Sequence, residues 1–285
     1  MKYRFLRFPQ GRGKAVTFSY DDGCKQDPKF VQLLTRYGLK CTFNFTCDAP
    51  PEDQIPKEVV EELFLNRGHE IAVHGYFHRA EGSLSPIEGI QDVLNCRLEL
   101  EKRYDRIIRG MAYPDFGITR FTNGASYEKI KNYLTELDIA YCRTLGGDNN
   151  RFELPTDWHC WMPTAHHNNP QIFEYVDAFL KLELSPKVYV ACRQPRLFYL
   201  WGHSFELDRG DNGWEHMEKI CQRLSGHDDI WYATNIEIYD YVTAYNSLVY
   251  SADGRIVYNP TLLTVWFDVD GVGYSIAPGE TLRLS

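Results

Sequence analysis

Residues 15–45 decide the fold, and they read AVTFSYDDGCKQDPKFVQLLTRYGLKCTFNF. An apolar strand pattern at 15–20 is followed by an amphipathic helix at 28–37, with Asp27 as its N-cap, and by a second apolar strand at 41–45. Strands that are apolar along their whole length are typical of a parallel sheet covered on both faces. This stretch therefore predicts a β-α-β unit.

The alternation of strand and helix continues along most of the chain. Further strands are expected at 70–74, 108–113, 139–144, 197–201 and 230–234. Further helices are expected at 56–66, 85–104, 126–137, 170–184, 213–224 and 235–249. About seven parallel strands alternating with helices favour an α/β fold, a distorted or incomplete (β/α) barrel.

The pattern changes after Tyr250. Asp253-Gly254 and Asp270-Gly271 are turn signals. Short antiparallel strands are expected at 255–258, 262–268, 273–276 and 281–284. A segment of about 35 residues is too small for an independent core. We therefore expect a barrel domain at residues 1–249 and a small β-appendage at 250–285, packed on the barrel. A carbohydrate-contacting appendage is the alternative.

Charge and composition exclude some classes of partner. The net charge of -8 argues against nucleic acid, and no window reaches the ~20 apolar residues of a membrane helix. Residues 1–9 lack the apolar stretch of a secretory signal. None of the eight cysteines belongs to a Cys-x-x-Cys pair. A cytoplasmic location is therefore expected, or secretion if a leader has been removed.

Carboxylates and histidines follow the predicted strands, where the functional groups of parallel sheets gather. Asp21 and Asp22 follow the first strand, His74 ends the strand at 70–74, and His78 comes shortly after it. Asp-Asp-Gly also suits a plain turn, but His-x-x-x-His places two imidazoles on one face of a helical turn. Asp22, His74 and His78 are therefore expected to hold one divalent ion, Zn²⁺ or else Co²⁺, Ni²⁺ or Fe²⁺.

Other residues are secondary candidates. His203 follows the strand at 197–201, a position suited to proton transfer. His166 and His167 are neighbours, so their side chains are expected to diverge as they do in regular structure. Trp158 and Trp201 are flat surfaces on which a sugar ring can stack.

Taken in order, several motifs resemble the polysaccharide deacetylases, the NodB-homology proteins of carbohydrate esterase family 4. They are Thr-Phe-Ser-Tyr-Asp-Asp at 17–22, His-Gly-Tyr-Phe-His at 74–78, a Tyr-Pro loop at 113–114 and a late strand that ends in His203. The resemblance spans about residues 14–205. It implies a distorted (β/α) barrel, one divalent metal ion, and hydrolysis of N-acetyl or O-acetyl groups on a carbohydrate substrate.

The resemblance also implies roles for individual residues. Asp21 falls on the catalytic base and His203 on the general acid, while Asp22, His74 and His78 fall on the metal ligands. The loop of Tyr113, Pro114, Asp115 and Phe116 falls on the segment whose backbone N–H holds the oxyanion. Asp157 and Trp158 fall on the family's Asp-Trp pair, which implies that Asp157 orients His203.

One departure leaves the partner of Asp21 open. The family has an arginine beside its catalytic base, and Ala112 stands at that position here. Arg109 lies too early in the sequence to align with it.

Three other interpretations also remain open. They are a hydrolase of a non-sugar amide on the same fold, a carbohydrate-binding protein without turnover, and a structural zinc protein, although no fourth ligand with suitable spacing is present.

Overall fold

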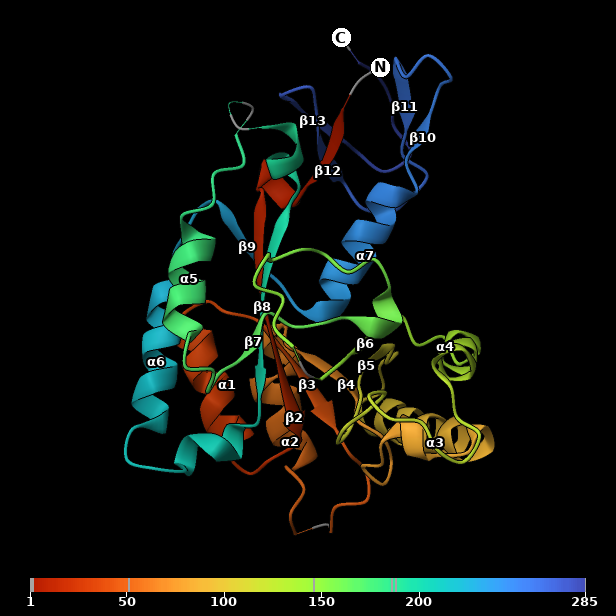
Figure 1. The fold of residues 1–285 in the computed structure, drawn as a ribbon, viewed down its shortest axis with the longest axis vertical. Helices are drawn as coiled ribbons and strands as arrows, with labels where there is room; N and C mark the ends of the chain where they lie inside the picture. Colours follow the sequence, from red (N-terminus) through yellow and green to blue (C-terminus); the bar gives the residue numbers. More distant parts are fainter. Residues whose placement is uncertain (1–2, 51, 146, 186, 188, 285) are drawn as a thin grey trace.

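A parallel sheet of eight strands forms the centre of the computed structural model, which describes residues 3–50, 52–145, 147–185, 187 and 189–284 (Figure 1). Its strands are β2 (Lys14–Asp22), β3 (Cys41–Phe45), β4 (Glu70–Val73), β5 (Gly110–Ala112), β6 (Tyr141–Arg143), β7 (Ala165–His166), β8 (Arg196–Gly202) and β9 (Ile230–Tyr232). They run in the order β6-β5-β4-β3-β2-β8-β7, with β9 paired to the start of β2. The sheet is an open half-barrel, so the predicted fold class is confirmed.

Helices pack on both faces of this sheet: the first six cover its outer face, and the last packs on the opposite face, where Ile238 and Tyr241 meet Leu197 and Tyr199. They are α1 (Asp27–Arg36), α2 (Lys57–Leu63), α3 (Pro86–Tyr104), α4 (Tyr127–Glu136), α5 (Ile172–Leu180), α6 (Gly213–Leu224) and α7 (Asn235–Asn246). In the view of Figure 1, α1, α5 and α6 lie to the left of the sheet, and α3 and α4 lie to its lower right. Among the described residues, no helix is long and apolar enough to cross a bilayer.

Local sequence signals fix where the helices begin. Ser85 and Glu88 form a capping box at the start of α3, with Pro86 as the first helical residue, as the sequence predicts. Asp27, by contrast, is not an N-cap. It is buried within the first turn of α1 and accepts a hydrogen bond from Ser204 Oγ at 2.6 Å. Its carboxylate therefore links α1 to the segment after β8.

The chain after α7 forms two small antiparallel sheets together with the N-terminal segment. One sheet has the order β1-β12-β13 and consists of β1 (Arg4–Arg7), β12 (Val265–Val269) and β13 (Val272–Ile276). The other has the order β10-β11-β14 and consists of β10 (Val249–Tyr250), β11 (Ile256–Tyr258) and β14 (Thr281–Arg283). Asp270 and Gly271 join β12 to β13 with positive φ angles, as their turn signal predicts. The strand β1 was not predicted from the sequence.

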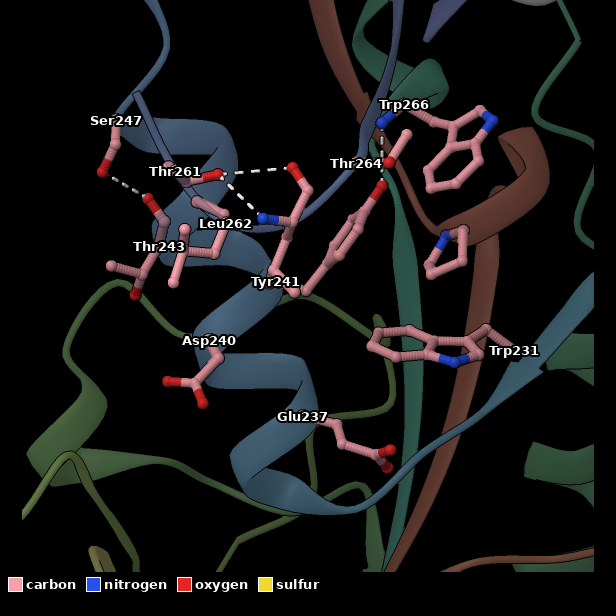
Figure 2. Close-up of a pocket in the computed structure, with 13 residues that line it drawn as sticks. Trp231, Glu237, Asp240, Tyr241, Thr243, Ser247, Thr261, Leu262, Thr264 and Trp266 are labelled. Atoms are coloured by element: carbon pink, nitrogen blue, oxygen red, sulfur yellow. Dashed lines mark hydrogen bonds between the residues drawn. The ribbon is translucent and has the colours of Figure 1, made fainter. Parts of the chain in front are cut away.

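A groove of about 720 Å³ lies between α7 and these sheets (Figure 2). Tyr241 of α7 spans it: its hydroxyl donates to the carbonyl of Arg7 at 2.8 Å and accepts from the backbone N–H of Trp266 at 2.9 Å. Pro9 and Trp231 also line the groove, near the amino ends of β2 and β9. The groove is thus at the end of the sheet opposite to the carboxyl ends of the strands.

Candidate metal centre and active site

The three predicted metal ligands meet at the carboxyl edge of the sheet. Asp22 is the last residue of β2, His74 follows β4, and His78 lies in the loop after it. Their ligand atoms lie within 4.8 Å of one another. Asp22 Oδ1 is 3.5 Å from His74 Nε2 and 3.2 Å from His78 Nε2. Donors that share a tetrahedral ion at about 2.1 Å lie about 3.4 Å apart, so the spacing fits one ion.

The loop that carries the two histidines is not helical, which corrects the predicted helical turn. Gly75 and His78 have φ angles of 71° and 52°, and the loop has no helix. Asp92 of α3 holds it instead, because its carboxylate accepts the backbone N–H groups of Tyr76 at 2.8 Å and Phe77 at 3.1 Å. The left-handed backbone at His78 is strained, and such strain gathers at functional sites.

The surroundings of the ligands also fit a cation. His74 Nδ1 is 2.9 Å from the carbonyl of Ala112, an arrangement that directs Nε2 toward Asp22. Asp22 Oδ1 is buried and has no hydrogen-bond partner among the described residues. Burial alone would raise the pKa of Asp22, but His74 and His78 hold it well below its usual value. Asp22 is therefore an anionic donor that a divalent ion would satisfy.

Asp21 has a partner that sequence reasoning missed. Arg143, at the end of β6 and fully buried, donates from Nη2 to Asp21 Oδ2. Asn44 of β3 donates to the other carboxylate oxygen at 2.9 Å. Arg143 therefore pairs with Asp21 as the family's arginine is expected to do. It comes from β6, whereas the position of the family's arginine, Ala112 in this chain, is in β5. In the sequence, Arg143 could have been noticed as a charged residue at the end of an apolar strand pattern.

His203 lies across the cavity from the ligands, and Glu206 orients it. His203 Nε2 is 3.9 Å from Asp21 Oδ2, and His203 Nδ1 is 3.3 Å from Glu206 Oε2. Burial alone would lower the pKa of His203, but Glu206, Asp21 and Asp22 together raise it. Asp157 contacts Lys131 Nζ and the Tyr127 hydroxyl, each at 2.7 Å. We therefore assign the orienting contact to Glu206 instead of Asp157.

The predicted oxyanion loop closes one side of the same cavity. The N–H of Tyr113 donates to the carbonyl of Arg143 at 3.1 Å, and Pro114 has no N–H. The N–H of Asp115 makes no hydrogen bond to the described residues, and Asp115 has a φ angle of 49°. Within this loop, Asp115 thus offers a free donor, whereas Tyr113 and Pro114 do not.

The cavity itself has a volume of about 220 Å³. The residues that line it are Asp21, Asp22, His74, His78, Tyr113, Asp115, Leu145, Trp201 and His203. Trp201 also stacks under the guanidinium of Arg143, 4.4 Å from its ring centre. Phe116 is exposed beside Asp115, while Trp158 packs edge-on against Trp161 and Tyr239 and does not line the cavity.

His166 and His167 converge, contrary to the expectation that they diverge. Their rings stack with centroids 4.4 Å apart. The strand β7 ends at His166, so the alternation of side chains in a strand does not extend to His167. Both rings face Glu206, which thus contacts three histidines: His166, His167 and His203.

Comparisons with known proteins agree with this geometry. The profile of the polysaccharide deacetylase family matches residues 9–140. A search of curated protein sequences finds no match. A proposed polysaccharide deacetylase of Mycobacterium smegmatis has a similar structure, with TM-score 0.55 and 16% identity over 86% of this chain and 96% of that one. The family 4 carbohydrate esterase domain of a multidomain xylanase from the hindgut metagenome of Trinervitermes trinervoides has TM-score 0.51 and 14% identity over 82% and 92%.

At these identities the two solved structures show a shared fold. The family profile covers the segment that contains Asp21, Asp22, His74 and His78. The resemblance seen in the sequence is therefore confirmed: residues 9–140 match the profile of the polysaccharide deacetylase family, and the fold is shared with the two solved structures.

Proposed function

We propose that this chain is a metal-dependent hydrolase that removes N-acetyl or O-acetyl groups from a carbohydrate and releases acetate. One observation carries the proposal: three donors at ligand spacing, a buried Asp21 and a half-buried His203 line the same cavity. The family match supports a carbohydrate as the substrate. A cavity of about 220 Å³ is smaller than the pockets of drug-sized ligands and suits an acetyl group.

The residues suggest a division of labour. An ion held by Asp22, His74 and His78 would supply an activated water and polarise the acetyl carbonyl. Asp21, held by Arg143 and Asn44, lies next to Asp22 and is suited to take a proton from the attacking water.

The other side of the cavity would serve the later part of the reaction. The Asp115 N–H is suited to hold the developing oxyanion. His203 presents Nε2 to the cavity while Glu206 holds Nδ1, so it is suited to protonate the departing amine or hydroxyl.

The test is acetate release from a panel of N-acetylated and O-acetylated sugars and of small non-sugar amides. Metal-loaded protein is compared with chelator-treated protein. Release from a sugar that stops after chelation and returns with added Zn²⁺ supports the proposal. Release from the amides alone identifies the non-sugar alternative, and sugar binding without release identifies a binding protein.

A further inference from the structure

We propose that His166, His167 and Glu206 form a second divalent-cation site, distinct from that of Asp22, His74 and His78. The three residues come together from two segments: His166 ends β7, His167 follows it, and Glu206 lies in the short 3-10 helix Ser204–Asp208 after β8. Their ligand atoms lie within 4.8 Å of one another.

The spacing of the donors is that of a shared ion. Glu206 Oε2 is 2.9 Å from His166 Nε2 and 3.7 Å from His167 Nε2. These two distances bracket the separation of about 3.4 Å between donors on a tetrahedral ion. Two imidazoles and one carboxylate are a donor set that suits Zn²⁺ or Co²⁺ and leaves further coordination positions to water.

His167 provides the independent observation. Its side chain is fully buried, and Nε2 has no hydrogen-bond partner among the described residues. The other ring nitrogen is 3.1 Å from the hydroxyl of Tyr20, which fixes the ring with Nε2 toward Glu206. A buried nitrogen without a partner is costly, and a cation would remove that cost.

The backbone is shaped to accept this ring. A Cβ atom at Gly202 would lie 1.9 Å from His167 Nδ1, so only glycine allows the ring to sit there. His166 is also oriented, because its Nδ1 accepts the N–H of Asn168 at 3.1 Å. A bound cation replaces the proton that His166 Nε2 shares with Glu206. His166 and Glu206 are 24% and 18% exposed, which leaves a route for the ion.

The experiment counts metal ions on the full chain after equilibration with micromolar Zn²⁺ and removal of free metal. We expect two equivalents in the wild type and one in His166→Ala. His74→Ala should also hold one, and the double variant none. Co²⁺ loading should give two additive visible spectra, of which each single variant keeps one.

Two controls keep the count interpretable. His227→Ala removes a half-buried histidine whose ring contacts the carbonyl of Arg223, far from both clusters in the sequence, and it should keep two equivalents. Glu206→Gln preserves the shape of the site and should hold one equivalent of metal. It takes the place of His166→Ala in the test if that variant fails to fold. A wild-type metal content that neither His166→Ala nor Glu206→Gln lowers overturns the proposal. Two bound ions without acetate release would count against the proposed function and not against this site.

Discussion

At the residue scale, Arg143 is the group on which the proposed base depends. Its guanidinium is fully buried against Asp21 and over Trp201. Arg143→Met leaves Asp21 buried without its cationic partner. We expect turnover to fall roughly 10- to 100-fold and the free energy of unfolding to fall by about 3 kcal/mol. Steady-state acetate release and urea unfolding measure the two effects.

Arg109 supplies the matched control. It lies close in sequence to the family's arginine position but pairs with Asp240 of α7, with Nη2 2.7 Å from Oδ2. Arg109→Gln should leave turnover unchanged, and Arg143→Met should still bind metal through Asp22. Equal turnover in Arg143→Met and the wild type would show that Asp21 does not need this partner.

His69 makes stability depend on pH. It is buried between the backbone N–H of Cys41 and the hydroxyl of Thr35, and burial lowers its pKa to about 3. Below the ordinary histidine pKa of about 6.5 only the unfolded chain takes up this proton, so stability is lost as pH falls from 6.5 toward 3. Between pH 7.5 and pH 5 this residue should cost about 2 kcal/mol.

An asparagine in place of His69 keeps an acceptor for the Cys41 N–H but does not titrate. We therefore expect the stability advantage of the wild type over His69→Asn to be roughly 2 kcal/mol smaller at pH 5 than at pH 7.5. Urea unfolding of both proteins at the two pH values measures this. An advantage that does not change with pH would mean that the pKa of His69 is the same in the folded and the unfolded chain.

The residues that the sequence identified are those that end strands. Asp22, His74 and His203 could be found because each directly follows an apolar run, and parallel strands bring such positions to one edge. Arg143 also ends an apolar run, but its partner Asp21 lies on another strand, and so does the residue that Asn44 contacts; neither pairing can be read from sequence neighbours. Glu206 lies only three residues after His203 and forms a capping box with it, and this local signal was missed.

At the scale of single elements, α3 fixes the metal-binding loop. Asp92 accepts both backbone N–H groups that precede His78, and a Cβ at Gly75 would come within 2.6 Å of its carboxylate. Asp92→Ala should release the loop and weaken Zn²⁺ binding by roughly tenfold or more. Chelator competition measures the affinity, and Gln91→Ala, exposed on the same helix, is the control. An unchanged affinity would show that the loop holds its shape without α3.

Elements with strong local signals were predictable to within a few residues. The bounds of α6 and β3 agree with the expected ranges, and α3 begins at its capping box. β7 has only two residues and was missed, because a strand that short has no periodicity. β1 was missed because its partner β12 lies at the other end of the chain, and short-range patterns carry no information about such pairing.

At the scale of the whole molecule, Tyr241 joins the barrel to the C-terminal sheets. Tyr241→Phe removes the hydroxyl that serves both Arg7 and Trp266, and leaves those buried backbone groups unpaired. We expect a loss of about 1–3 kcal/mol in the free energy of unfolding. Tyr258→Phe, on an exposed side chain of β11, should change it little. Equal stability of the two variants would mean that water replaces the hydroxyl in the groove.

The division of the chain at residues 249 and 250 remains a prediction.

The pairing of β1 with β12 has a consequence for synthesis on the ribosome. Arg4 aligns with Val269 and Arg7 with Trp266, so β1 leaves the ribosome long before its partner β12 has been synthesised. The half-barrel can assemble during this interval, because all of its strands, β2 to β9, precede β12 in the sequence. The unpaired edge of β1 stays open to other chains until β12 has been synthesised, so slow synthesis of the residues between the two strands should favour aggregation.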